Sequence, residues 1–284
     1  MENNVFVYPT ASLFGKALAR IANSSGLLRL RRFFLSLVPF LVLESDVRDV
    51  VYLTWLVEVD AVAHLVPPGV KLWQREGKTP FTILTYTHGH FGPAAARGLR
   101  AIFPSPLQSN WRLYVDELPD GRPAQGVVLF VKNIMGSALY AISSRLFSDA
   151  LPTHLAADFR HQRNGQSYQT SITSGSGSAP SLRYAAQVAQ QKALTPEFET
   201  VFPSWSAAVE FLSLQDSAIA HVDDIARIAY ATIELPIALE SVLPLELVSD
   251  SLECGFVRAI SKEQAPFCFA VPSTKFKVVS ERLL

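Results

Sequence analysis

The 284-residue chain has little cysteine and little charge, and each shortage narrows the class of protein. Cys254 and Cys268 are too few for a disulfide framework, which suits a reducing, cytoplasmic compartment, and we interpret both as buried apolar residues. Lys+Arg and Asp+Glu both number 25, so the formal net charge is zero and the balance disfavours DNA or RNA as a partner. With 49% hydrophobic residues, the sequence is typical of a globular protein with a large core.

The sequence also lacks an apolar run long enough to cross a membrane. In residues 27–43 three arginines precede FFLSLVPFLVL, a run of 11 residues that contains Pro39. A transmembrane helix needs roughly 20 apolar residues. A signal peptide fits no better, because the run starts far from Met1 and no small-residue cleavage site follows it. We therefore predict a buried strand or helix here, with an anchor at a membrane surface as the less favoured alternative.

Nucleotide-binding and metal-binding motifs are missing too, so we predict no cofactor and no metal. The low-complexity segment TSGSGSAP at residues 173–180 ends in none of the phosphate-binding patterns, and we predict a flexible loop or a boundary between two halves. His88 and His90 are two residues apart, a spacing that places both on one strand face, but no third ligand lies nearby. We keep them as candidate ligand-binding residues. For His221 with Asp223, helix capping is favoured over part of a catalytic triad.

What is present is a series of extended runs rich in β-branched and aromatic residues. After a short amphipathic helix capped by Thr10, four such runs predict strands, and clusters of Pro, Gly and Asp separate them. Short connections of this kind favour antiparallel pairing. The predicted strands cover residues 50–59, 81–91, 110–115 and 126–131.

Helical patterns come later in the sequence. They cover residues 137–147, 181–194, 205–214 and, less clearly, 222–231. The C-terminus returns to two short strand patterns, at residues 266–272 and 276–284. The whole predicts an α+β, β-rich fold in which helices pack outside a sheet.

Several segments in this order resemble a known family. The residues that carry the resemblance are YLTWLVEVDAVAHLVPPGVKL (52–72), QSNWRLYV (108–115), GVVLFVKNI (126–134) and SSRLFSDALPTHLAADF (143–159). The chain is similar to the acetoacetate decarboxylase superfamily, in its YqjF-like branch of unknown function. The resemblance implies one domain over residues 1–284, an antiparallel β-barrel or cone with peripheral helices and an internal pocket. Residues 1–45 would form an N-terminal helical and apolar extension packed on it.

The resemblance also implies a Schiff-base lysine in a Pro-Lys-Lys-like segment, assisted by a glutamate before the NWRLYV-like strand. Here residues 151–156 read LPTHLA, and Gln108 stands where the glutamate is expected. Neither Thr nor His forms an imine, so decarboxylation through that lysine is disfavoured. Lys132 is a substitute candidate, because it alternates in phase with Val128 and Phe130 and would then point inward. The alternative is a lysine that ends its strand in solvent.

The remaining hypothesis centres on His154 as a general acid or base, with Arg112 as a second catalytic candidate. Arg145 and Gln108 are candidate ligand-binding neighbours, since an arginine holds a carboxylate bidentately. The alternative is that His154 is a buried structural histidine. Two functions follow: lyase, dehydratase or cyclase chemistry on a small apolar oxo or carboxylic compound, or non-catalytic binding of an apolar ligand or lipid. A homo-oligomer is left open, and membrane contact is disfavoured.

Overall fold

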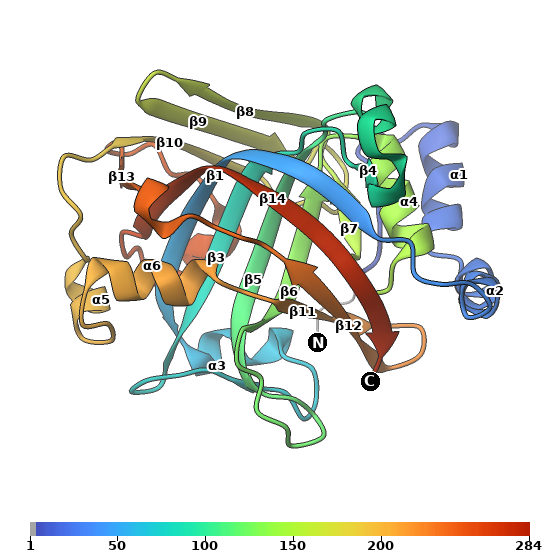
Figure 1. The fold of residues 1–284 in the computed structure, drawn as a ribbon, viewed down its shortest axis with the longest axis horizontal. Coiled ribbons are helices and arrows are strands. Elements are labelled where there is room, and N and C mark those ends of the chain that lie inside the picture. The colour runs from blue at the N-terminus through green and yellow to red at the C-terminus, as the bar shows by residue number, and fades with distance from the viewer. Residues whose placement is uncertain (1–3) are drawn as a thin grey trace.

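Strands dominate the structure, a computed structural model that describes residues 4–284 (Figure 1). The strands are β1 (Leu43–Glu58), β2 (Lys71–Leu72), β3 (Lys78–Thr87), β4 (Gly92–Pro93), β5 (Leu107–Glu117), β6 (Val127–Met135), β7 (Thr153–Leu155), β8 (Asp158–Asn164), β9 (Ser167–Thr173), β10 (Leu182–Val188), β11 (Ser217–Val222), β12 (Arg227–Glu234), β13 (Leu243–Leu247) and β14 (Phe267–Leu283). The helices are α1 (Leu13–Ala22), α2 (Ser25–Leu35), α3 (Val59–Val62), α4 (Ala138–Phe147), α5 (Pro196–Glu199), α6 (Trp205–Ser213) and α7 (Gly255–Ser261), with the 3₁₀ helices η1 (Ala63–Leu65), η2 (Ala94–Ile102) and η3 (Leu239–Ser241).

Seven strands close into a ring. The sheet runs in the order β1-β3-β5-β6-β11-β12-β14, and β14 also pairs with β1. The long strand β14 makes this closure possible, because one edge follows β1 while the other edge pairs first with β13 and then with β12. Pairing is antiparallel except where β6 meets β11 and β7. The ring confirms the predicted β-rich α+β fold, and the strands predicted in residues 50–131 are β1, β3, β5 and β6.

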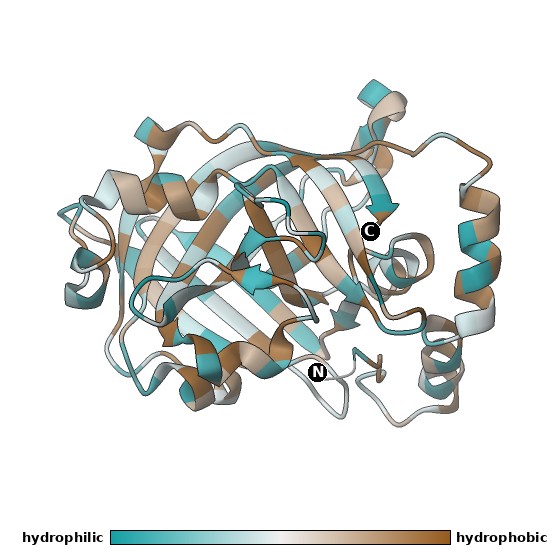
Figure 2. Cartoon of the chain, turned by 90° about the horizontal axis from the view of Figure 1, so that it is seen from below, coloured by the Kyte–Doolittle hydropathy of each residue, from teal (hydrophilic) through white to brown (hydrophobic). Residues whose placement is uncertain are grey.

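Side chains alternate between the two faces of the ring, which gives the strands their banded hydropathy in Figure 2. The register places Tyr114, Val128, Ala218, Ala231 and Glu281 on one face of five successive strands. This is the inner face, because the guanidinium of Arg112 on this face of β5 lies 5.6 Å from the ring of Tyr52 on β1, across the intervening β3. Such a contact is expected on the concave side of a curved sheet.

The outer face of β1, β3 and β5 is covered by a second layer. Strands β9, β10 and β13 and helix α7 pack there against Trp55, Phe81 and Trp111 in the largest apolar cluster. The ring of Phe256 in α7 lies 5.5 Å from that of Phe81 and 5.3 Å from that of Trp111. Cys254 and Cys268 are free and buried, as the sequence predicts.

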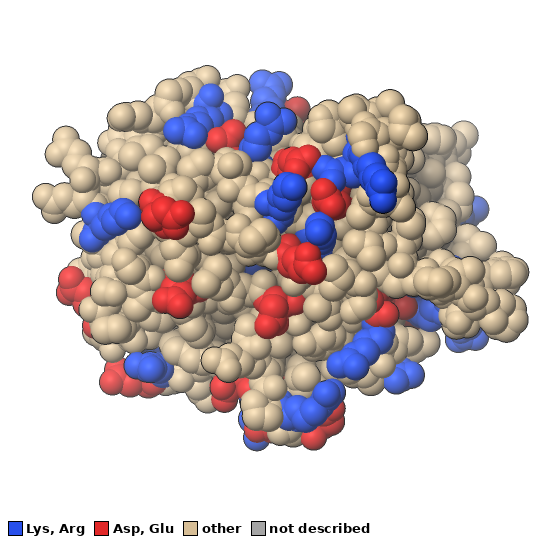
Figure 3. Space-filling view, in the orientation of Figure 1, with Lys and Arg blue, Asp and Glu red and all other residues tan. Residues whose placement is uncertain are grey.

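Positive and negative side chains are interspersed over the surface seen in Figure 3.

Three sequence predictions about secondary structure are wrong. Residues 181–194 contain β10, not a helix, because pairing with β9 and β13 buries every second residue from Leu182 to Ala186. Residues 222–231 are the end of β11, a turn and the start of β12, so no helix is there for Asp223 to cap. The two C-terminal strands are one strand, β14. In addition, Ser12 rather than Thr10 caps α1.

The loop at residues 173–180 is neither a boundary between halves nor loosely attached. It joins the paired strands β9 and β10 within the same sheet. Its backbone is held by the N-terminal segment, since the N–H of Ser176 donates to the carbonyl of Pro9 at 3.0 Å and that of Ser178 to the carbonyl of Val7 at 3.1 Å.

The prediction of a buried element in residues 27–43 is also wrong. Helix α2 has no buried residue, and residues 36–41 are exposed. The reason is that α2 contacts the protein through Arg31 and Arg32, which pair with Asp149 and Asp224. Within the described residues, no helix has the length and apolar character needed to span a bilayer.

Candidate functional site

The inner face of β5 carries a row of polar side chains. Gln108, Asn110, Arg112 and Tyr114 alternate with Ser109, Trp111 and Leu113, which face outward. All four inner side chains are buried. Polar groups are costly to bury unless they are hydrogen-bonded or serve a ligand. We call the following set the inner polar cluster: Gln108, Asn110 and Arg112 of β5, Asn133 of β6, and His88, which directly follows β3.

Arg112 is a buried cation without a carboxylate partner. It is 3% exposed, and its guanidinium donates to the carbonyl of Leu212 at 2.7 Å. The rings of Tyr52 and Tyr114 lie 5.6 and 5.5 Å from it. Its Nε has no hydrogen-bond partner among the described residues, and no Asp or Glu of residues 4–284 pairs with it. A buried unpaired charge is expensive, so this position favours an anionic ligand.

Two buried side-chain amides, those of Asn110 and Asn133, lie on the same face as the arginine, and each has an unpaired hydrogen-bonding atom. The Nδ2 of Asn110 donates to the Oδ1 of Asn133 on the neighbouring strand. This leaves the Oδ1 of Asn110 and the Nδ2 of Asn133, both buried, without a partner in the described part of the chain. One free acceptor and one free donor next to a cation are suited to a small polar ligand.

His88 closes the row at the other end. Its Nδ1 and Nε2 lie 2.8 Å from the Oγ of Ser45 and 2.7 Å from the Oε1 of Gln108. Its ring stacks on that of Phe91 at 4.4 Å. Burial lowers the pKa of His88 to about 4, so the ring is neutral at physiological pH. This imidazole fixes the orientation of the Gln108 amide.

Glu281 is an inner-face carboxyl that the sequence analysis did not single out. It accepts hydrogen bonds at 2.6 Å from the Oγ of Ser148 and from the backbone N–H of Asp149, and burial raises its pKa. The next two residues in its row on the inner face are Ala231 and Ala218, whose side chains are small. The pairing of Glu281 with the middle of the chain depends on long-range register, so no local sequence pattern marks it.

The structure separates His154 from Arg112. Thr153, which pairs with Asn133, is on the inner face, and His154, which pairs with Ile134, is on the opposite one. His154 is buried, with Nδ1 at 2.7 Å from the Oγ of Ser178 and Nε2 at 2.8 Å from the Oδ1 of Asn4. Burial lowers its pKa well below 6.5, and Lys132 and Arg145 lower it further.

Arg145 contacts the same N-terminal segment. Its guanidinium donates to the carbonyl of Asn4 at 2.6 Å and to that of Thr153 at 3.2 Å, and it lies 5.6 Å from the ring of Phe6. Burial lowers its pKa to about 10. His154 and Arg145 thus both hold residues 4–8 against the barrel, away from the inner polar cluster.

Lys132 is outside the ring, contrary to the phase predicted from Val128 and Phe130. A β-bulge lies between the pairs Arg112↔Phe130 and Trp111↔Lys132, so the alternation reverses and Lys132 shares the outer face with Trp111. It lines a small pocket of about 20 Å³ together with Asn4, His221 and Asp223. His221 Nδ1 lies 2.7 Å from the Oδ1 of Asp223.

His88 and His90 do not share a strand face. Strand β3 ends at Thr87, and His90 has a positive φ of 52°, which turns its side chain away from His88. His90 lines an open surface groove beside Asp46 and Thr274. Among the described residues, no group of three His, Cys, Asp or Glu side chains is placed to hold a metal ion.

Comparison with solved structures supports the fold. The enduracididine biosynthesis enzyme MppR, with HEPES buffer bound, is 13% identical with a TM-score of 0.56, over 87% of this chain and 88% of that chain. The acetoacetate decarboxylase of Legionella pneumophila is 9% identical with a TM-score of 0.52, over 85% and 86%. An acetoacetate decarboxylase-like enzyme of Sphingomonas wittichii RW1 is 10% identical with a TM-score of 0.52, over 87% and 94%. At these identities the likeness concerns the fold alone.

The sequence comparison gives the family. No curated protein matches the sequence. Residues 44–229, which run from β1 into β12, match the family model DUF2071, described as an uncharacterized conserved protein. This match covers well over half of the chain. The chain therefore belongs to the DUF2071 family and has the fold of acetoacetate decarboxylase-like proteins.

Proposed function

We propose that this protein binds a small carboxylate of the 2-oxo acid type inside the ring, with Arg112 as its ion partner. The observation that carries the proposal is a guanidinium that is 3% exposed and has no Asp or Glu partner in residues 4–284. An arginine binds a carboxylate through two parallel hydrogen bonds, and a bound anion removes the cost of the buried charge. The open amide atoms of Asn110 and Asn133 supply contacts for the oxo group.

The fold relatives support a ligand of this class. MppR, with a TM-score of 0.56, has been solved in complex with pyruvate, a 2-oxo acid. The two proteins are only 12% identical. The inference that the ligand is a carboxylate therefore rests on Arg112, and the similarity adds a precedent from the same fold.

Chemistry at this site would proceed without an imine. Thr153 occupies the inner face of β7, and β5, β6 and β7 present no lysine to the inner face. Glu281 is the acid–base candidate, because it is an inner-face carboxyl whose pKa is raised by burial. Proton transfer from this residue suits a lyase, dehydratase or cyclase, whereas His154 is on the opposite face of the sheet.

The test is calorimetric titration of the protein with pyruvate and longer 2-oxo acids. Arg112→Gln is expected to weaken binding at least about tenfold, since it removes a charge-assisted pair. Arg112→Lys keeps the charge without the fork and should give an intermediate affinity. Arg160→Gln is the matched control, because the Arg160 side chain is 75% exposed and pairs with Asp158 at the surface.

Two results would overturn the proposal. One is a wild-type protein that binds no 2-oxo acid, and the other is an Arg112→Gln variant that is folded by circular dichroism and binds as tightly as the wild type. Turnover of a bound acid that disappears in Glu281→Gln, while binding is retained, would separate catalysis from simple ligand storage.

Trapping with borohydride tests the absence of imine chemistry. Incubation with pyruvate and sodium borohydride is expected to leave Lys132 unmodified, because the bulge turns this side chain to the outer face, away from Arg112. Intact-mass and peptide mass spectrometry would reveal a reduced adduct, with Lys132→Ala as the control. A stoichiometric adduct on Lys132 that needs Arg112 would show instead that an amine reaches the bound acid.

A further inference from the structure

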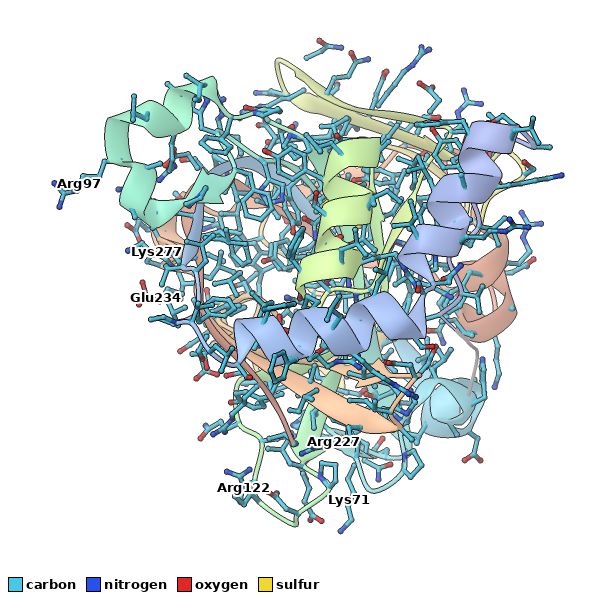
Figure 4. All side chains as sticks on the ribbon, turned by 90° about the vertical axis from the view of Figure 1, so that its right-hand side faces the viewer. Lys71, Arg97, Arg122, Arg227, Glu234 and Lys277 are labelled. Carbon is cyan, nitrogen blue, oxygen red and sulfur yellow. The ribbon has the colours of Figure 1, made fainter. Side chains whose placement is uncertain are left out.

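One side of the molecule exposes a large set of apolar side chains. Helices α1, α2 and α4 lie together there with η2 (Figure 4). All but two of the exposed large hydrophobic residues of the described chain are in residues 5–41, η2 or α4. We call the following set the apolar helical face: Leu13, Phe14, Ile21, Leu27, Leu30, Phe33, Phe34, Leu35, Leu37, Val38, Phe40, Leu41, Leu99, Ile102, Leu139 and Phe147.

Helix α2 has the reverse of the usual amphipathic orientation. A surface helix normally packs its apolar stripe on the core and exposes its charges. In α2 the guanidinium of Arg32 lies 2.8 Å from the carboxylate of Asp149 and 2.7 Å from that of Asp224, facing the protein. Phe33 and Phe34 are 60% and 57% exposed. These ion pairs therefore hold the helix with its aromatic side outward, and the projection where Figure 1 places α2 is mostly tan in Figure 3.

The segments that form this face carry charges of one sign. Residues 4–43, η2 and α4 contain no Asp or Glu. They do contain exposed cations: Lys16, Arg20, Arg29 and Arg97, the last of which points outward at the edge of the face in Figure 4. An apolar surface whose own charged residues are all Lys and Arg complements anionic lipid headgroups over acyl chains.

The same charges argue against a second copy of the chain as the occupant. A two-fold contact through this face would bring Arg20, Arg29 and their copies together, with no carboxylate in the face to compensate them. Because no described helix spans a bilayer, the contact would be at the interface and not across it.

We propose that the apolar helical face binds the surface of an anionic lipid bilayer, with Leu30, Phe33 and Phe34 inserted below the headgroups. The proposal is independent of the carboxylate site. Binding would place the ring of strands next to the membrane, and the inner polar cluster would remain inside the ring.

The test is co-sedimentation of the full chain with vesicles. We expect binding to vesicles of phosphatidylglycerol and phosphatidylcholine in equal parts, and clearly weaker binding to pure phosphatidylcholine or in high salt. The double variant Phe33→Ser/Phe34→Ser should lower the partition coefficient at least about tenfold, since two large apolar side chains no longer enter the lipid. Leu214→Ser/Val248→Ser, which changes two exposed hydrophobic residues far from the face in sequence, should bind like the wild type.

A charge variant separates the electrostatic contribution to lipid binding from the apolar one. Light scattering tests whether a second copy of the chain occupies the face. Arg20→Gln/Arg29→Gln should reduce binding to anionic vesicles and leave the weak binding to phosphatidylcholine unchanged. The proposal fails if the folded wild type does not bind anionic vesicles. If light scattering then shows dimers that Phe33→Ser/Phe34→Ser dissociates, the face joins two copies of the chain instead. It also fails if the Leu214→Ser/Val248→Ser control loses as much binding as the aromatic variant.

Discussion

Replacing His154 with Ala is expected to lower the free energy of unfolding by roughly 3 kcal/mol, through lost packing and two unpaired buried partners. The imidazole is 1% exposed and bridges Ser178 and Asn4, so it links the 173–180 loop to the N-terminal segment. Urea unfolding followed by tryptophan fluorescence measures the change. Binding of a 2-oxo acid should remain near wild type in the fraction that is folded, because His154 faces away from Arg112.

The control for this variant is His64→Ala, which removes an exposed histidine of η1 and should leave stability unchanged. His154→Asn retains one of the two hydrogen bonds and should recover part of the loss. A His154→Ala protein with wild-type stability but abolished turnover would give the opposite answer. It would make His154 the acid–base residue suggested by the sequence.

The sequence predicts the central strands well because each has a local signature. The runs in β1, β3, β5 and β6 combine β-branched and aromatic residues with turn clusters at their ends, and these signals do not depend on the rest of the chain. The apolar pattern of residues 181–194 was equally compatible with a helix. Only the edges of β9 and β13 on either side of it decide for a strand.

Helix α2 shows a different limit. Its apolar residues predict burial, because burial is the usual fate of a Leu- and Phe-rich segment. The outcome depends on Asp149 and Asp224, more than a hundred residues away, which bind the arginines and turn the apolar side outward. A pattern within one segment carries no information about such distant partners.

In the candidate site, too, some positions follow from local spacing and others depend on pairing with distant parts of the chain. Arg112 and Gln108 belong to one strand with regular alternation, so their common face follows from spacing, and both lie in the inner polar cluster. Lys132 lies within β6, two residues after Phe130, and a single bulge between them reverses its direction. Glu281 joins the inner face only through closure of the ring by β14, which no local pattern reveals.

Acidification is expected to destabilise the protein between about pH 6.5 and about pH 4, and His88 is expected to account for much of the effect. Burial lowers the pKa of His88 from its ordinary value of 6.5 to about 4. Above pH 6.5 the ring is neutral in the folded and the unfolded chain. As the pH falls, the unfolded chain takes up a proton that the folded chain refuses, so stability decreases until the folded ring also titrates. The size of this contribution is roughly 3 kcal/mol.

Urea unfolding at a series of pH values from neutral to about pH 4 tests this linkage. The buried rings of His154 and His161, whose pKa values burial also lowers, act in the same direction, so His88→Gln should flatten the pH dependence without abolishing it. His64→Gln is the matched control and should keep the wild-type slope. If His88→Gln also keeps it, the imidazole between Ser45 and Gln108 does not stay neutral in the folded protein. The inner polar cluster would then contain a second cation beside Arg112, and its preference for a carboxylate would rest on both.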